Sequence, residues 1–577
     1  MYVNVKNFSC AEGIEKRKEQ ITMKNYTKYK AYETIDLPDR TWPSQKIKKA
    51  PKWCSVDLRD GNQALVTPMG LKEKLQFFEF LVRMGFKDIE IGFPAASDTE
   101  YEFTRALIEG NYIPEDVTVQ VLTQSRGKII QKTFEALRGV KKAIIHLYNS
   151  TSTLQRDVVF RNSKAETIEL ASFGAKTIKN LAEQYPESDF TFEYSPESFT
   201  GTEMDFAAEI CNAVIDIWQP TPEKKVIINL PSTVEMSTPN VYADQIEYMC
   251  RNLKNRENVL VSLHAHNDRG TAVAATELGM MAGADRVEGT LFGNGERTGN
   301  ADILILGMNL FTQGINPQLD FSQIDDIIEI YEKSTRMPVH PRHPYAGELV
   351  FTAFSGSHQD AIRKGMAAMK KHRDFWEVPY LPLDPQDVGR SYDPIIRINS
   401  QSGKGGVTFI LEQNYGLYLP KDFQKDVGKV ITDFSDQMQT EITPETIYNV
   451  FLENYVDIRK PLQLNYYKTR TVNEDWDVVA IEAEIEFHGE KHYIEAEGNG
   501  VVSAFCRGVQ DIVGAEIDIV DYRGHSMEYG TKARAISYIQ MKDNQGNKFF
   551  GAGSSSSVGK SSLRAVVSAI NKMLSAS

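Results

Sequence analysis

The chain has 577 residues, of which 41% are hydrophobic and 25% are charged, and its formal net charge is −13. This composition is typical of a globular protein and excludes a disordered or fibrous one, while the length predicts roughly two to four domains. The acidic balance argues against nucleic-acid binding, because basic residues are nowhere dense enough to neutralise a row of phosphates.

From residue 53 to about residue 313, short apolar runs alternate with polar loops and amphipathic stretches of helix length. The apolar runs predict eight strands, at residues 53–58, 88–93, 117–122, 142–147, 189–194, 225–230, 259–264 and 286–292. Strands that alternate with helices indicate parallel βαβ units, and eight units in about 260 residues match a (β/α)8 TIM barrel. The alternative is a doubly wound open sheet, which is disfavoured because no GxGxxG follows the first strand.

The first helix after the first strand has the clearest pattern. Thr67 is expected to cap its N-terminus, and Pro68 suits the first turn. Leu71 and Phe78 belong to one apolar stripe, and Gly85 is expected to end the helix.

Beyond the barrel, residues 314–430 are loop-rich and concentrate prolines, which indicates linking subdomains and short helices. From about residue 440 the pattern changes to two hairpins, 479–487 with 491–497 and 533–541 with 548–553. A helix is expected after each, near 500–512 and at 560–574. This weak strand–strand–helix repeat predicts a small α+β domain whose pseudo-twofold interface could hold a small ligand.

In a TIM barrel the C-terminal ends of the strands form one rim, and the active site lies there. Most of the predicted strands deliver a polar or titratable side chain to this rim. These residues are Arg59 and Asp60 after strand one, His146 in strand four, Ser195 and Glu197 from strand five, Thr233 from strand six, His264 and His266 from strand seven, and Asn300 after strand eight.

His264 and His266 are two positions apart, so on a strand both imidazoles point to the same face. Asp60 can add a carboxylate, and Asn300 becomes its neighbour once the barrel closes. This set leaves coordination positions free on a divalent ion, as a catalytic site requires. The alternative is that the histidines are hydrogen-bonded structural residues, while Arg59 either closes the barrel through a salt bridge or polarises a carbonyl or oxyanion.

Several motifs carry a family resemblance. They include LRDGNQ (58–63), IHLYNSTS (145–152), NLPSTVEMSTPN (229–240), HAHNDRGTA (264–272) and GNGERTGNAD (293–302). Over roughly residues 30–410 the chain resembles the long form of the 2-isopropylmalate synthase family, metal-dependent TIM-barrel enzymes that join an acyl-CoA to a 2-oxo acid. Homocitrate and citramalate synthases share the barrel and the metal motif, and they are the near alternatives.

The resemblance implies that Asp60, His264 and His266 bind a divalent metal ion, with Asn300 as a fourth, weaker ligand. Mg²⁺ is the expected ion, and Mn²⁺ or Zn²⁺ are the alternatives. The ion is expected to bind the 2-oxo acid through its carboxylate and ketone oxygens, a Lewis-acid role.

The resemblance also assigns roles around the oxo acid. Arg59 would stabilise the alkoxide that forms on the ketone oxygen, while His146, Ser195 and Thr233 match positions that line this substrate. Thr233 is expected to hydrogen-bond the substrate carboxylate.

A base must remove a proton from the methyl group of acetyl-CoA. Glu197 and His358 match the residues associated with this step, and Tyr392 matches a tyrosine near the reacting groups. In the family, the segment that carries His358 reaches over a barrel, commonly that of the partner subunit. A homodimer is therefore implied.

The implied reaction condenses acetyl-CoA with 3-methyl-2-oxobutanoate and water to give 2-isopropylmalate and CoA, the first committed step of leucine biosynthesis. A lyase on the same barrel would carry a cysteine in the loop after strand eight, and a carboxyltransferase would carry a lysine at a strand end. The chain has neither at those places. A non-catalytic sensor would leave the polar rim unexplained.

These inferences predict four segments. Residues 1–50 form an N-terminal extension, 51–325 the catalytic barrel, 326–435 linker subdomains that contribute to the active site, and 436–577 a C-terminal regulatory domain. By resemblance, this last domain binds L-leucine, which inhibits the enzyme; no leucine-binding residue can be matched.

The five cysteines are scattered and form no CxxC pair, which fits a reducing compartment. No apolar run approaches the roughly 18 residues needed to cross a bilayer. The acidic N-terminal region is atypical of a transit peptide. We therefore expect a cytoplasmic protein that has no membrane-spanning segment.

Overall fold

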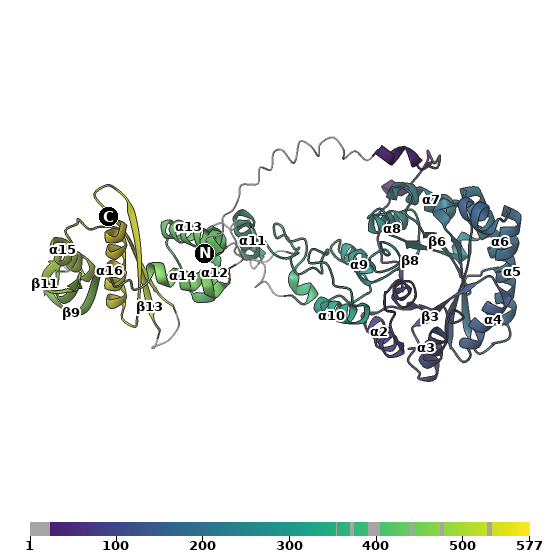
Figure 1. Cartoon of the computed structure of the whole chain (residues 1–577), viewed down its shortest axis with the longest axis horizontal. Helices are drawn as coiled ribbons and strands as arrows, with labels where there is room; N and C mark the ends of the chain where they lie inside the picture. Colours follow the sequence, from purple (N-terminus) through teal and green to yellow (C-terminus); the bar gives the residue numbers. More distant parts are fainter. Residues whose placement is uncertain are drawn as a thin grey trace, which may run out of the picture. The chain divides into compact units, whose positions relative to one another are not determined.

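The computed structural model describes residues 24–353, 355–369, 374–390, 404–438, 442–473, 478–527 and 533–576. The chain forms two compact units, which divide between Val339 and His340. Figure 1 shows their secondary structure along the chain.

The first unit is a closed barrel of eight parallel strands in the order β1 to β8. The strands are β1 Lys52–Ser55, β2 Asp88–Gly92, β3 Thr118–Gln124, β4 Lys142–Ser150, β5 Asp189–Glu197, β6 Val226–Ser232, β7 Val259–Ala265 and β8 Arg286–Gly289. Closure comes from β1 pairing with β8, where Trp53 lies opposite Val287. All eight predicted strands are present, and the barrel, not the open sheet, is confirmed.

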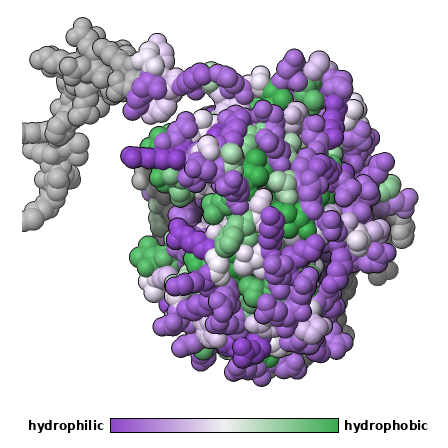
Figure 2. All heavy atoms as spheres, turned by 90° about the vertical axis from the view of Figure 1, so that its right-hand side faces the viewer, coloured by the Kyte–Doolittle hydropathy of each residue, from purple (hydrophilic) through white to green (hydrophobic). Residues whose placement is uncertain are grey.

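Helices surround this barrel as an outer ring (Figure 1). They are α2 Leu71–Met84, α3 Asp98–Glu109, α4 Gly127–Ala136, α5 Lys164–Ala182, α6 Met204–Trp218, α7 Pro239–Asn252, α8 Ala272–Met281, α9 Ile303–Phe311 and α10 Ile324–Thr335. Their apolar sides face the strands, and Figure 2 shows one outer face of the barrel unit as mainly hydrophilic with scattered hydrophobic groups. This division is that expected of amphipathic helices on a barrel.

The start of α2 corrects the sequence prediction. The helix begins at Leu71 after Gly70, and Thr67 lies in the preceding loop. Asn62 Oδ1 accepts a hydrogen bond from Met69 N at 2.7 Å, and Glu73 Oε2 accepts one from Gly70 N at 2.9 Å. These side chains satisfy the loop backbone, so the helix starts three residues later than the predicted cap at Thr67 implied, at the first residue of its apolar stripe. Gly85 ends it as predicted, with φ at 104°.

In the described part of the second unit, the α-helices that precede the sheets are α11 Gly356–Met369, α12 Lys404–Tyr415, α13 Lys421–Met438 and α14 Pro444–Tyr455. Two antiparallel three-stranded sheets follow, ordered β11-β10-β9 and β12-β13-β14. Their strands are β9 Leu462–Asn473, β10 Val478–Phe487, β11 Glu490–Gly498, β12 Asp518–Ser526, β13 Ala535–Lys542 and β14 Lys548–Ser555. Helix α15, Val501–Val513, follows the first sheet, and α16, Val558–Ala576, follows the second.

Both predicted hairpins and both helices of this repeat are present, but each repeat has a further first strand that the sequence prediction missed. These strands, β9 and β12, lie at sheet edges. Edge strands carry many exposed polar side chains, as in KTRT of β9 and DYRGHS of β12, and such segments resemble loops. The repeat is therefore strand–strand–strand–helix.

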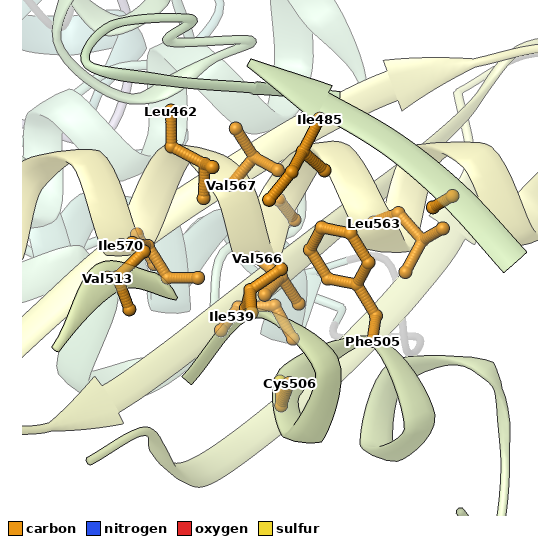
Figure 3. Packing of buried hydrophobic residues seen from close by; sticks show 14 of the residues in the cluster. Leu462, Ile485, Phe505, Cys506, Val513, Ile539, Leu563, Val566, Val567 and Ile570 are labelled. Atoms are coloured by element: carbon orange, nitrogen blue, oxygen red, sulfur yellow. The ribbon is translucent and has the colours of Figure 1, made fainter. Parts of the chain in front are cut away.

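One core joins the two halves of this repeat. Phe505 of α15 lies near Leu563 and Val566 of α16, and Val513 of α15 lies near Ile570 of α16, in one cluster that also contains Ile539 of β13 (Figure 3). These side chains are almost wholly buried. The two copies of the repeat therefore share one hydrophobic core.

Candidate metal and substrate site at the barrel rim

A short helical turn places Arg59 and Asp60 over the barrel mouth. Strand β1 ends at Ser55, earlier than predicted, and Asp57–Gly61 form one turn of π-helix. The Asp57 carboxylate accepts hydrogen bonds from Ser55 Oγ at 2.7 Å and from Leu291 N at 3.0 Å. Asp57 thus ties this turn to the segment that follows β8.

The two histidines of β7 converge on Asp60. Nε2 of His264 lies 3.5 Å from Asp60 Oδ2, and Nε2 of His266 lies 3.7 Å from the same oxygen. The ligand-type atoms of the three residues all lie within 4.8 Å of one another, and all three side chains are buried. The structure therefore brings together the two imidazoles and the carboxylate, with the spacing that one cation requires.

Asn300 lies behind Asp60. Its Nδ2 donates to Asp60 Oδ2 at 2.7 Å and to the carbonyl of Asn294 at 2.9 Å. The loop GNGERTGN reaches this position only with glycine at two points: a Cβ on Gly295 would lie 2.1 Å from Asn300 Nδ2, and one on Gly299, whose φ is 92°, would lie 1.8 Å from the Gly293 carbonyl.

The donor set fits a divalent metal ion. Asn300 Oδ1 is buried and has no hydrogen-bond partner in the part of the chain that the structure describes. Buried polar atoms without partners are uncommon and point to a missing ligand or water. Two imidazoles, a carboxylate and an amide oxygen suit a divalent ion with open coordination positions.

The electrostatics of this group favour a cation near Asp60. Burial opposes ionisation of Asp60, but Arg59 and His264 hold the pKa of its carboxyl well below its usual range. Burial also opposes a charge on His264, yet its hydrogen bonds with Asp60 and Glu288 raise the pKa of that imidazole to about 9. For His266, burial and the neighbouring His264 lower the pKa to about 4. Asp60 is therefore anionic at neutral pH.

A cavity of about 270 Å³ opens beside this group. The predicted site residues that line it are Arg59, Asp60, His146, Ser195, Glu197, Thr233, His264 and His266. Phe93, Leu122, Tyr148 and Pro231 add apolar surface to its wall. The wall of the cavity therefore combines charged and polar groups with apolar surface that can contact hydrocarbon.

Hydrogen bonds fix the polar side chains of this cavity. Nε2 of His146 lies 2.7 Å from Ser195 Oγ, and Ser150 Oγ donates to Glu197 Oε2 at 2.5 Å. Thr233 Oγ1 accepts from Ser198 N at 2.9 Å. Ordered side chains of this kind can orient a bound substrate without first losing conformational freedom.

Two buried carboxylates behind the rim were missed from the sequence. Glu90 accepts from Arg59 Nε at 2.5 Å and lies 2.7 Å from Nδ1 of His146. Glu288 lies 2.8 Å from Nδ1 of His264. The sequence signal for both was an acidic residue in the middle of a short predicted strand, because a carboxylate that faces a barrel interior requires a partner there.

His358 and Tyr392 belong to the second unit. His358 lies on α11, is exposed and stacks on Tyr380 with ring centroids 3.9 Å apart. Tyr392 lies outside the described residues. The catalytic roles expected for both stay predictions.

Three known protein families match successive parts of the chain. Residues 50–330 match the family described as HMGL-like. Residues 348–412 match the alpha-isopropylmalate synthase post-catalytic domain, and residues 441–574 match the LeuA allosteric (dimerisation) domain.

Curated relatives match nearly the whole length. A 2-isopropylmalate synthase of Acetoanaerobium sticklandii is 79% identical over 550 residues, covering 95% of this chain and 97% of the relative. Enzymes with the same name from Clostridium acetobutylicum and Rhizobium meliloti are 55% and 53% identical, each over 95% of this chain and 99% and 98% of the relative, respectively. In the part of the chain that the structure describes, no helix is long and apolar enough to span a membrane.

Proposed function

The chain belongs to the 2-isopropylmalate synthase family, and we propose that it condenses acetyl-CoA with 3-methyl-2-oxobutanoate and water to give 2-isopropylmalate and CoA. The observation that carries this proposal is that Glu197 lines the same cavity as Asp60, His264 and His266. A candidate base and a candidate metal group thus face one substrate-sized space, as a condensation between two carbon centres requires.

Asp60, His264, His266 and the amide oxygen of Asn300 would hold Mg²⁺, with Mn²⁺ or Zn²⁺ as alternatives. The bound ion supplies Lewis-acid polarisation of the ketone of the oxo acid. Arg59 lies beside Asp60, with Nη1 3.1 Å from Asp60 Oδ1, and its guanidinium stabilises negative charge that develops on the ketone oxygen.

Glu197 acts as the base that removes a methyl proton from acetyl-CoA. Its carboxylate is held by Ser150 at the cavity wall, so it can approach a thioester bound over the rim. His358, contributed by the partner subunit of a homodimer, and Tyr392 assist at this step. Hydrolysis of the resulting thioester then makes the overall reaction strongly favourable.

The cavity wall supports the choice of oxo acid. Phe93, Leu122 and Pro231 offer an apolar surface, which favours the isopropyl group of 3-methyl-2-oxobutanoate. The second carboxylate of 2-oxoglutarate would lose its hydration against this surface. His146, Ser195 and Thr233 orient the polar end of the substrate from the other part of the wall.

A thiol-release assay tests this function. The protein is assayed with acetyl-CoA and, in turn, 3-methyl-2-oxobutanoate, 2-oxoglutarate and pyruvate, each with and without a chelator. We expect the first acid to have the highest kcat/KM and the chelator to stop the reaction. A large preference for 2-oxoglutarate or pyruvate would replace the proposal with homocitrate or citramalate synthesis.

We further propose that L-leucine inhibits the enzyme by binding in the second unit. A cavity of about 690 Å³ lies beside the N-terminal ends of α15 and α16, and its apolar lining includes Val501, Val502 and Ile519. The lining suits a branched side chain, and the free N–H groups at the helix ends suit a carboxylate. The match to an allosteric domain supports this regulation.

The four-segment division at residues 50, 325 and 435 also remains part of the proposal, as does a cytoplasmic location. Residues 436–577 would then be the regulatory segment, and residues 326–435 would carry His358 and Tyr392 to the active site.

A further inference from the structure

A fully buried ionic cluster lies inside the barrel, below the candidate metal group. Arg286 and Glu288 are two positions apart on β8, and their side chains have relative exposures of 0%. His146, Glu193 and Glu288 have the spacing of a second metal group, but Arg286 Nη1, 3.5 Å from Glu193 and 2.8 Å from Glu288, already places a cation there. This cluster therefore needs no second metal ion, and we infer its function from the side chains that its members contact.

Glu288 is surrounded by hydrogen-bond donors. Its Oε1 accepts from Arg286 Nη1 at 2.8 Å and from Gln120 Nε2 at 2.9 Å. Its Oε2 accepts from Asn229 Nδ2 at 3.2 Å and lies 2.8 Å from Nδ1 of His264. An ionised carboxylate accepts at both oxygens, so this set of donors suits the charged form of Glu288.

The charged form of Glu288 determines which nitrogen of His264 is protonated. Because an ionised carboxylate can only accept, Nδ1 of His264 is the donor to Glu288, and Nε2 is the atom that faces Asp60. When a divalent ion displaces the second proton of this imidazole, the lone pair is therefore on Nε2. His266 differs, since its Nδ1 has no hydrogen-bond partner within the described residues. Only one of the two imidazoles thus has its tautomer and ring orientation fixed by a carboxylate.

We propose that Glu288 is a positioning residue that orients His264 for the divalent ion, with Arg286 holding Glu288 in place. This inference rests on the proposed function, because it assumes that the rim group binds a metal. Arg286 Nε also donates to Asp88 Oδ2 at 3.0 Å, so an unbroken chain of contacts runs from the barrel interior to the rim. These contacts link four side chains into one network: Asp88, Arg286, Glu288 and His264.

Titration of the metal-free protein with Mn²⁺ by isothermal calorimetry, without substrates, tests the proposal. We expect Glu288→Gln to raise the Kd for Mn²⁺ by about 10- to 100-fold, because the amide presents a donor where the carboxylate presented only acceptors. Saturating Mn²⁺ should restore much of the lost kcat, since the ligands themselves remain. A purely structural role would not separate metal affinity from kcat in this way.

Glu90→Gln is the matched control. Glu90 is equally buried and contacts His146 and Arg59, neither of which is a candidate ligand at the rim. It reaches Asp60 only indirectly, through Arg59, and the amide oxygen of Gln can still accept from Arg59 Nε. We expect its Kd for Mn²⁺ to stay within about twofold of the unmodified protein. If Glu288→Gln fails to fold, the double variant Arg286→Met with Glu288→Leu replaces the ion pair by apolar groups of similar size, an exchange that proteins often tolerate. This double variant is expected to show the same loss of affinity.

A Glu288→Gln protein that binds Mn²⁺ as tightly as the unmodified chain would overturn the inference and leave the proposed function intact. Equal weakening by Glu288→Gln and Glu90→Gln would also overturn it, because the effect would then be general to the barrel interior. An unmodified protein that binds no Mn²⁺ would overturn the metal role itself, and this inference with it.

Discussion

Asn300 Nδ2 donates a hydrogen bond to Asp60 Oδ2 at 2.7 Å, although the two residues are 240 positions apart in the chain. The contact crosses the seam where β8 pairs with β1, so it depends on barrel closure. His264 and His266 reach the same carboxylate from β7. The candidate metal group is therefore a product of the closed topology, since no local segment of the sequence contains it.

The first prediction concerns His266. We expect His266→Ala to lower the rate of thiol release by more than about 100-fold, because even residues behind metal ligands contribute roughly 10- to 100-fold. The variant should keep its fold, since His266 Nδ1 has no protein partner to lose among the described residues. Turnover and the circular dichroism spectrum measure these two effects. His340→Ala, at an exposed histidine, is the control and should keep full activity.

The second prediction concerns Glu197. If it is the base, Glu197→Gln should lower kcat by about 10²- to 10⁴-fold, the usual contribution of general base catalysis. Its affinity for Mn²⁺ should be unchanged, because Glu197 is not in the metal group. Steady-state kinetics and metal titration distinguish the two effects. Glu183→Gln, at the exposed end of α5, should behave like the unmodified protein, and a Glu197→Gln variant with near-normal kcat would rule out the assigned role.

Much of the barrel could be predicted from the sequence because its strands are buried apolar runs separated by polar loops. Such runs identify strands, and the rim position of His264 follows from strand parity. The alternation of side chains along a strand did not predict the helical turn at Asp57. Its hydrogen bonds to Ser55 and Leu291 stabilise a helical turn where the sequence predicted continued strand.

Glu90 and Glu288 were missed for a different reason. Site residues were expected only at the strand ends, whereas these two carboxylates lie further inside the barrel and contact His146 and His264. Their partners are on other strands, so only the three-dimensional arrangement identifies the contacts. Edge strands β9 and β12 were missed because their exposed polar residues resemble loop sequence.

The third prediction concerns leucine inhibition. Ile519 lines the cavity beside α15 and α16, so Ile519→Glu would place a second carboxylate near that of a bound leucine. We expect the leucine concentration for half inhibition to rise by at least about tenfold, since tenfold corresponds to only about 1.4 kcal/mol. The uninhibited rate should not change.

Val520→Glu provides the matched control for Ile519. Val520 is the next residue on β12, does not line the cavity and is 44% exposed. Its substitution should leave inhibition by leucine intact. Comparable loss of inhibition in both variants would count against this cavity as the leucine site.

The fourth prediction concerns the pH dependence of stability at Asp57. Burial raises the pKa of this carboxyl to about 7, against the hydrogen bonds from Ser55 and Leu291 that favour its charge. The unfolded chain ionises near the ordinary value of 3.8. Between these values the unfolded state has released a proton that the folded state keeps, so stability falls as pH rises from about 4 to 7, by roughly 4 kcal/mol in all.

Asp57→Asn removes this titration and keeps the contacts, because the amide oxygen can accept from Leu291 N while the amide nitrogen donates to Ser55 Oγ. We therefore expect the thermal midpoint of the variant, relative to the unmodified protein, to increase between pH 5 and pH 7 and to level off above pH 7. Differential scanning calorimetry at unit pH intervals measures this difference. Midpoints that run parallel over the whole range would mean that Asp57 is already ionised in the folded barrel at pH 5, and that the hydrogen bonds outweigh its burial.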